Sequence, residues 1–274
     1  MTPIRVASFF SGIGGIELGL VLASERFEIV SQSEIDPCCC AILRERFEGV
    51  PNLGNIKTVR PEDIPDADLW VAGFPCQDFS IIGKGVGLSG KRGGLWRDLF
   101  RAVRVVRPRV VLLENVPAIL ERGMGGVLGD LAGIGYDTEW NCLRSSDFGA
   151  PSIRNRWFCC AYSGSERLER VVPEGTETET TRRMDRESTG LGSVSVLREL
   201  PMYDPPGARA RLRLPADRGM DLGPLLGSSR WAAFTGSLRV DPRFPERVHR
   251  LRALGNSVCV PVISAIGRRL AEII

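Results

Sequence analysis

The sequence predicts an α/β protein with one large domain and a polar segment inserted near its C-terminal end. Three observations indicate this class. Apolar runs of strand length alternate with helical segments from residue 4 to 162, and a glycine-rich turn follows the first run. A third observation is that several runs end in a carboxylate. The 274 residues suffice for one large core, or for a large domain with a small one.

The first predicted unit is a strand over residues 4–10, a turn over Ser11–Gly15 and a helix to about Leu22. This is the plan of a nucleotide-binding βα unit, because glycines let a ligand approach the backbone and the helix N-terminus. The glycines at 12, 14 and 15 do not form the dinucleotide motif Gly-x-Gly-x-x-Gly. A Rossmann dehydrogenase is therefore disfavoured.

The second predicted strand, residues 27–33, ends at Glu34, which follows Gly14 by 20 residues. An acidic residue near that offset commonly hydrogen-bonds the ribose hydroxyls of an adenosine cofactor. A solvated carboxylate at a strand end is an equally good interpretation of the spacing. A helix is expected from Pro37 to about Phe47, and it carries the cysteine triplet 38–40.

A buried strand over residues 68–72 leads into the stretch Gly73–Ser80, which contains Cys76. Six glycines lie between residues 83 and 94, so a glycine-rich loop is expected after this cysteine. Such a position suits a nucleophile beside a loop. The alternative is a thiol that only packs in the core.

The later elements continue the alternation. A predicted strand over 108–113 ends at Glu114, again at the carboxyl end where ligands of open α/β sheets collect. Arg154 and Arg156 precede a strand over 157–162 and are expected on the same side, either in surface ion pairs or as a clamp for a phosphate and a base. The remaining predictions are helices over 95–106 and 127–134 and a strand over 137–143.

The segment from 163 to about 230 is rich in glycine, proline, serine and threonine. Arg209, Arg211 and Arg213 alternate with period two, which would line three guanidinium groups along one strand face. A nucleic-acid groove and an exposed edge strand are both compatible with this pattern. A final helix with apolar residues at 262, 266, 270 and 274 is expected to return to the main core, which makes the polar segment an insertion.

Composition excludes several classes of site. The eight cysteines form no Cys-x-x-Cys pair and His249 is the single histidine, so we expect reduced thiols, no metal site and no Ser-His-Asp triad. No run approaches the roughly 18 apolar residues of a membrane span and no signal-peptide pattern is present, so we expect a cytoplasmic protein without a membrane segment. Arginine makes up 33 of the 36 basic residues, which favours forked contacts to phosphates and bases.

The order of these motifs resembles the DNA (cytosine-5)-methyltransferase family. The motifs are the glycine turn with Glu34, then Gly-Phe-Pro-Cys-Gln at 73–77, Glu-Asn-Val at 114–116, Arg154-x-Arg156, and Gly-Asn-Ser-Val at 255–258. The resemblance covers nearly all of 4–162 and 247–272. It implies a Rossmann-like S-adenosylmethionine-dependent methyltransferase sheet with a small inserted target-recognition domain, divided as a catalytic domain (1–162), a target-recognition domain (163–246) and a returning C-terminal segment (247–274).

The resemblance also implies residue roles. S-adenosylmethionine would be the cofactor, with Glu34 on its ribose and Ile35 against its adenine. Asn55 replaces an aspartate of many members, and Ser152 replaces the glutamine of Gln-x-Arg-x-Arg. The full set of implied cofactor residues is Phe10, Gly12, Gly14, Glu34, Ile35, Asn55, Ile56, Pro75, Leu95, Asn256 and Val258.

For catalysis, the Cys76 thiolate would add to carbon 6 of cytosine, because carbon 5 is a poor nucleophile while the ring is aromatic. A protonated Glu114 would hydrogen-bond ring nitrogen 3, Arg156 would contact the base oxygen, and Arg154 would be a second clamp. The base must be flipped out of duplex DNA. DNA contacts are expected from Gln77, Ser80, Arg92, Arg209, Arg211 and Arg213, and we expect a monomer.

Two other functions share these motifs. A tRNA cytosine-5 methyltransferase would carry the same motifs, although the separate insertion and Gly-Phe-Pro-Cys-Gln favour DNA. A DNA-binding homologue without activity is the second alternative, and the presence of Cys76, Glu114 and Arg156 argues against it.

Overall fold

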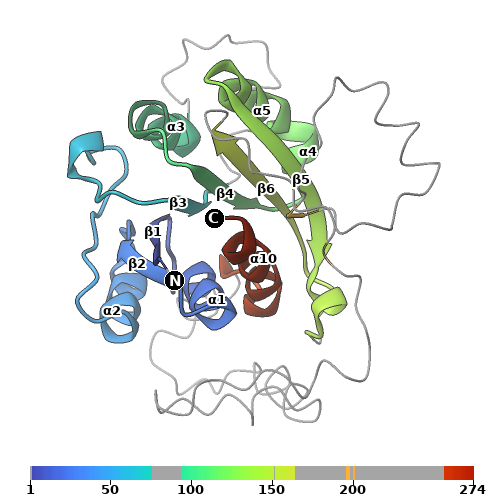
Figure 1. Ribbon diagram of the computed structural model, residues 1–274, viewed down its shortest axis with the longest axis horizontal. Helices are drawn as coiled ribbons and strands as arrows, with labels where there is room; N and C mark the ends of the chain where they lie inside the picture. The colour runs from blue at the N-terminus through green and yellow to red at the C-terminus, as the bar shows by residue number, and fades with distance from the viewer. Residues whose placement is uncertain (1, 76–93, 151, 164–195, 198–199, 201–255) are drawn as a thin grey trace, which may run out of the picture.

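A computed structural model describes residues 2–75, 94–150, 152–163, 196–197, 200 and 256–274 (Figure 1). Its centre is a six-stranded sheet in the order β2-β1-β3-β4-β6-β5. The first four strands of this order, β2, β1, β3 and β4, run parallel to one another, and β6 is antiparallel to both β4 and β5. The strands are β1 (Ile4–Phe9), β2 (Phe27–Ser31), β3 (Leu69–Gly73), β4 (Val110–Asn115), β5 (Tyr136–Arg144) and β6 (Asn155–Ser163). The predicted α/β class is confirmed.

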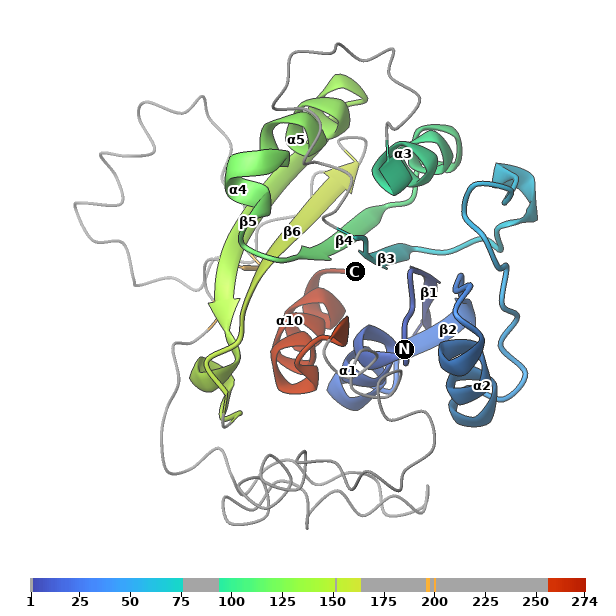
Figure 2. The same ribbon diagram turned by 180° about the vertical axis from the view of Figure 1, so that it is seen from behind.

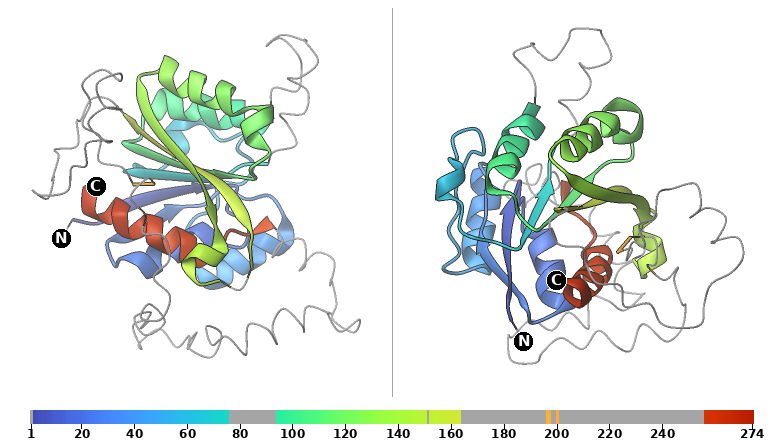
Figure 3. Two further views of the ribbon diagram at one scale, coloured as in Figure 1. Left: turned by 90° about the vertical axis from the view of Figure 1, so that its right-hand side faces the viewer. Right: turned by 45° about the horizontal axis from the view of Figure 1, so that its top comes forward.

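Helices cover both faces of the sheet (Figures 2 and 3). One layer contains α1 (Gly15–Ala23), α2 (Pro37–Arg46) and α10 (Val260–Ile273), and the other contains α3 (Gly94–Val106), α4 (Ile119–Arg122) and α5 (Met124–Gly133). Two short 3₁₀ turns, η1 (Pro61–Asp63) and η3 (Ser145–Phe148), complete the described elements. A core lies between each helical layer and the sheet, as expected for strands of a parallel sheet, which are buried on both faces.

Local sequence explains where α2 begins. The Asp36 side chain accepts hydrogen bonds from the backbone N–H groups of Cys38 and Cys39 at 2.9 and 3.0 Å, and Pro37 occupies the first turn. This is the arrangement of an N-cap aspartate followed by proline. The predicted helix after Pro37 is thus confirmed, with the cysteine triplet in its first turn.

The C-terminal helix packs against α1 at close range because both helices carry glycine at the contact. A Cβ atom on Gly19 would lie 2.5 Å from Cβ of Ile263, and one on Gly267 would lie 2.8 Å from Cβ of Ala23. The predicted return of this helix to the main core is confirmed by its buried side chains. As a result, residues 256–258 reach the start of α1.

Most predicted elements occur close to their expected bounds, and two begin earlier than expected. Helix α5 begins at Met124 and is preceded by α4. Strand β6 begins at Asn155, because pairing with β5 extends to the Asn155–Arg144 register, and this places Arg156 within the strand. Within the described ranges, no helix is both long and apolar enough to cross a membrane. The same part of the chain contains no cluster of three metal-ligating side chains.

Candidate active site

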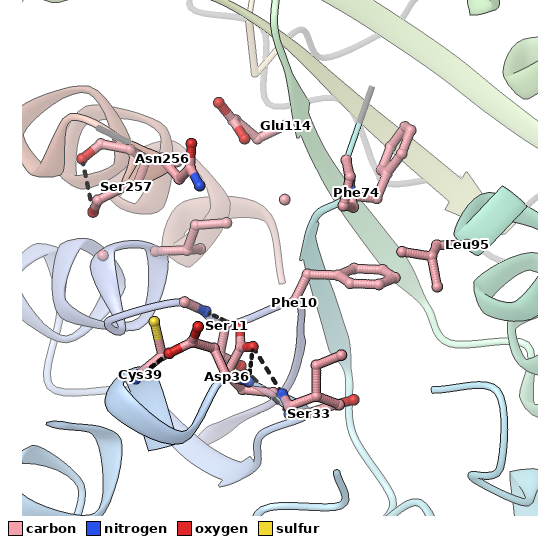
Figure 4. Close-up of a pocket in the computed structure, with 18 of the residues that line it drawn as sticks. Phe10, Ser11, Ser33, Asp36, Cys39, Phe74, Leu95, Glu114, Asn256 and Ser257 are labelled. Atoms are coloured by element: carbon pink, nitrogen blue, oxygen red, sulfur yellow. Dashed lines mark hydrogen bonds between the residues drawn. The ribbon is translucent and has the colours of Figure 1, made fainter. Parts of the chain in front are cut away.

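A cavity of about 690 Å³ lies at the carboxyl ends of β1, β2, β3 and β4. This is the edge where open α/β sheets bind ligands. Figure 4 shows Glu114 on one side of the cavity and Ser11 and Asp36 on the opposite side. Ten of the eleven predicted cofactor residues line it: Phe10, Gly12, Glu34, Ile35, Asn55, Ile56, Pro75, Leu95, Asn256 and Val258.

The Glu34 carboxylate is fixed by backbone donors. One oxygen accepts from the N–H of Gly12 at 2.8 Å, and the other accepts from the N–H groups of Ile35 and Asp36, both at 2.8 Å. Three backbone donors hold the carboxylate at the wall of the cavity, and Oε2, which accepts a single one of these bonds, keeps further acceptor capacity. The side chain joins the glycine turn after β1 to the segment after β2.

The turn after β1 has an unusual backbone. Phe10 has φ of 55°, in the left-handed region that non-glycine residues rarely adopt, and Gly12 has φ of 56°. Such strain persists only where surrounding structure enforces it, and it is concentrated at binding sites. Here it turns the chain at the end of β1, where Phe10 lines the cavity (Figure 4).

Gly14 is the one predicted cofactor residue that does not line the cavity. It forms the N-cap of α1 with φ of 81°, and a Cβ atom at this position would lie 2.5 Å from the Phe47 ring. Glycine is therefore required here by the turn and by the packing of α1 against the residue that follows α2.

A buried polar cluster lies behind the turn. Glu17 of α1 is fully buried, and one of its carboxyl oxygens accepts from the Gln32 amide at 3.3 Å. Burial raises the pKa of Glu17, and hydrogen bonds from Ser8, Ser11 and Gln32 oppose that rise. The cluster reaches the cavity through Ser11, whose hydroxyl is 2.9 Å from that of Ser8.

Glu114 and Arg156 meet across β4 and β6. Arg156 Nε lies 3.0 Å from Glu114 Oε1, with the two side chains 18% and 9% exposed, and both residues line the cavity. Burial raises the pKa of Glu114 to about 7, although the positive charges of Arg156 and Arg154 act in the opposite direction. A carboxyl group with this pKa can hold a proton near neutral pH and donate it in a hydrogen bond.

Arg154 interacts electrostatically with both residues of this pair but does not line the cavity. Its Nε and Nη2 atoms are buried without a hydrogen-bond partner among the described residues. Burial lowers the pKa of Arg154, repulsion from Arg156 adds to this effect, and attraction to Glu114 opposes it. The guanidinium group is thus close enough to influence the Glu114–Arg156 pair electrostatically.

The chain that leads to Cys76 is held from two sides. A Cβ atom on Gly73 would lie 3.1 Å from Glu114 Oε2, so glycine lets the end of β3 approach this carboxyl group. Asn115 donates from Nδ2 to the Phe74 carbonyl oxygen at 2.9 Å, while its Oδ1 accepts from the Val116 N–H at 2.8 Å. These contacts fix the backbone two residues before Cys76.

Several predicted residues lie outside the described part of the chain. They are the nucleophile candidate Cys76 and the DNA-contact candidates Gln77, Ser80, Arg92, Arg209, Arg211 and Arg213.

Sequence motifs missed several residues of the cavity. Some of these residues belong to the quoted motifs but are assigned no role there, and adjacency to a motif residue is a usable signal for them: Ser11, Gly15, Gly73, Phe74, Asn115, Val116 and Ser257. The other missed lining residues are Ile16, Ser33, Asp36, Cys39 and Gly54.

A family model described as C-5 cytosine-specific DNA methylase matches residues 4–206. The type II methyltransferase M.NgoFVII of Neisseria gonorrhoeae is 33% identical over 182 residues, which cover 64% of this chain and 48% of that protein. The chain spans about half the length of the curated relatives M.NgoFVII, M.NgoBV and M.NlaIV.

Solved structures give a similar result. A putative DNA modification methyltransferase encoded within a prophage of E. coli has a TM-score of 0.51 and 27% identity, covering 61% of this chain and 49% of that chain. The S. pombe Dnmt2 methyltransferase has a TM-score of 0.62 over 98% of both chains. Its identity of 20% supports a shared fold alone.

Proposed function

Because this chain belongs to the C-5 cytosine-specific DNA methylase family, we propose that it transfers a methyl group from S-adenosylmethionine to carbon 5 of cytosine in duplex DNA. The observation that carries the proposal is the Glu114–Arg156 pair, with its separation of 3.0 Å, at the wall of the cavity. A buried carboxyl group that holds a proton beside a guanidinium group presents both hydrogen-bond donors that a cytosine ring requires.

The cavity fits the cofactor in size and chemistry. Its volume of about 690 Å³ is typical of small-molecule sites, and its walls combine apolar side chains with a few polar groups. Glu34 would hold the ribose, Ile35 and Ile56 would pack on the adenine, and Asn256 would lie on the opposite wall. When bound there, S-adenosylmethionine supplies the methyl group that carbon 5 receives.

The residues at the other side of the cavity would activate the base. The Cys76 thiolate forms a bond to carbon 6, and Glu114 donates its proton in a hydrogen bond to ring nitrogen 3 as electron density moves into the ring. Arg156 donates to the base oxygen and stabilises the adduct. After methylation, a solvent water molecule accepts the carbon 5 proton, the electron pair of that bond restores the carbon 5–carbon 6 double bond, and the Cys76 thiolate leaves carbon 6.

The position of carbon 5 inside duplex DNA determines how the substrate must bind. Carbon 5 cannot be reached inside a duplex by this cavity, so the cytosine must be flipped out, at a cost of a few kcal/mol for unstacking. We assign DNA contacts to the stretch that begins at Gln77 and recognition of the target sequence to residues 163–246. The enzyme is proposed to act as a monomer in the cytoplasm.

Methyl transfer can be measured with tritiated S-adenosylmethionine. The wild-type protein is expected to label duplex DNA, and Cys76→Ser is expected to abolish labelling while leaving cofactor binding intact. Robust labelling by Cys76→Ser would overturn the assignment of the nucleophile. Labelling of tRNA with none of DNA would favour the tRNA methyltransferase, and cofactor binding without labelling of either would favour an inactive DNA-binding homologue.

A further inference from the structure

We propose that Asn52 is a positioning residue for the cofactor, acting through Glu34. This inference deepens the proposed function and rests on it. The segment that contains Asn52 lies beside the end of β2: Gln32 and Asn52 form an isolated parallel bridge. The backbone N–H of Gln32 donates to the Pro51 carbonyl oxygen at 2.9 Å, and the backbone N–H of Leu53 donates to the Gln32 carbonyl oxygen at 2.7 Å. Asn52 is thereby placed next to Glu34.

The carboxamide of Asn52 makes four hydrogen bonds. Its Oδ1 accepts from the N–H groups of Glu34 and Gly54, both at 3.0 Å. Its Nδ2 donates to the Glu34 carbonyl oxygen at 3.1 Å and to Cys40 Sγ at 3.2 Å. Because an amide presents both an acceptor and donors, this one side chain binds both backbone groups of Glu34.

The hydrogen bonds of Asn52 hold two segments of the chain that line the cavity. The Glu34 backbone is held by Asn52 while its carboxylate is held by Gly12, Ile35 and Asp36, so the side chain is restrained at both ends. Gly54, the second backbone donor to Asn52, also lines the cavity, and its carbonyl oxygen accepts from Ser33 Oγ at 2.7 Å. Asn52 therefore links the segment after β2 to the loop that carries Asn55 and Ile56.

Asn52 itself does not line the cavity and is exposed. A residue in this position cannot touch the cofactor, and its replacement should not prevent folding. We therefore expect its loss to weaken cofactor binding by letting Glu34 and Gly54 move. The turnover rate at saturating cofactor should be nearly unchanged, because the contacts to the base are made elsewhere.

The test compares Asn52→Leu, which keeps the shape and removes all four hydrogen bonds, with the wild type. Binding of S-adenosylmethionine is measured by calorimetry, and melting temperature is measured without ligand. We expect the dissociation constant to rise about tenfold, which is about 1.4 kcal/mol, and kcat at saturating cofactor to stay within about twofold. Asn52→Ala should behave in the same way.

Asn141→Leu is the matched control. Asn141 lies on β5 at the opposite edge of the sheet, and it also bonds backbone groups through both ends of its amide, at Leu197 and Cys142. This variant should leave the dissociation constant unchanged. A double-mutant cycle adds a second readout: in a Glu34→Ala background, Asn52→Leu should raise the dissociation constant by less than about threefold.

The outcomes separate the inference from the proposed function. Equal cofactor affinity of Asn52→Leu and wild type would overturn the inference and leave the function standing. A loss of affinity that Asn141→Leu shares, or one that remains tenfold in the Glu34→Ala background, would also overturn it. Failure of the folded wild-type protein to bind S-adenosylmethionine would overturn the proposed function, and the inference with it.

Discussion

The ionisation of Glu114 should be controlled by Arg156. Arg156→Met removes the positive charge whose Nε lies 3.0 Å from the Glu114 carboxyl group and leaves a side chain of similar length. An opposite charge at this range lowers the pKa of a carboxyl group by about 1–3 units. Starting from about 7 in the wild type, the pKa of Glu114 should therefore rise to about 8–10 in the variant.

The titration can be observed directly by ¹³C NMR of protein labelled at glutamate, with Glu114→Gln used to assign the signal. Arg104→Met, on the exposed face of α3, serves as the charge-matched control and should leave the pKa of Glu114 unchanged. A wild-type Glu114 that is fully ionised at pH 5 would show that burial does not raise the pKa of this carboxyl group. An unchanged or lower pKa in Arg156→Met would refute the control of Glu114 by Arg156.

The Glu114 carboxyl group also makes the unfolding free energy of the protein depend on pH. The pKa of Glu114 is about 7 in the folded protein and near 4.5 in the unfolded chain, so the folded state binds this proton more tightly. The resulting stabilisation is present below about pH 4.5 and is lost as pH rises through about 7. At about 1.36 kcal/mol per pKa unit, roughly 3 kcal/mol of unfolding free energy should disappear over this window in the wild type and not in Glu114→Gln.

Two further predictions concern the close approach of Gly73 to Glu114 and the buried hydrogen bond between Gln32 and Glu17. Gly73→Ala places a Cβ 3.1 Å from Glu114 Oε2 and should lower methyl transfer about tenfold by displacing that carboxyl group. Gly129→Ala, whose Cβ would meet nothing within 4 Å, is the control, and equal activity of the two variants would contradict the prediction. Glu17→Leu should lower the unfolding free energy in urea by about 1–3 kcal/mol, because it leaves the buried Gln32 amide unpaired, whereas Glu17→Gln should have little effect. A Glu17→Leu protein as stable as the wild type would contradict this account.

The sequence predicted the site best where a residue lies at or just after the carboxyl end of a strand. Glu34 and Glu114 lie at strand ends, and the carboxyl ends of parallel strands meet at one edge, so strand prediction alone brought them to the same region. The contact between Glu114 and Arg156 could not be predicted from strand ends alone, because it requires β4 and β6 to be neighbours in the observed register. Sequence spacing carries no information about that contact.

Other features could not be predicted because they depend on backbone conformation. Gly14 lies between the cavity-lining Gly12 and Gly15 in sequence, but its left-handed conformation at the N-cap turns it toward Phe47. Asn52 belongs to no motif, and its four hydrogen bonds arise only when the segment after α2 returns beside β2. Its role could be found only once these segments were placed in space.

We propose that this chain methylates cytosine in DNA by means of Cys76, and this activity can be tested in a cell. DNA from a host that expresses the wild-type protein is analysed by bisulfite sequencing beside DNA from hosts that express Cys76→Ser or Glu114→Ala at equal levels. We predict 5-methylcytosine at one recurrent sequence with the wild type and at none with either variant. Methylation that persists with Cys76→Ser, or its absence with a folded wild-type protein that binds S-adenosylmethionine, would contradict the account.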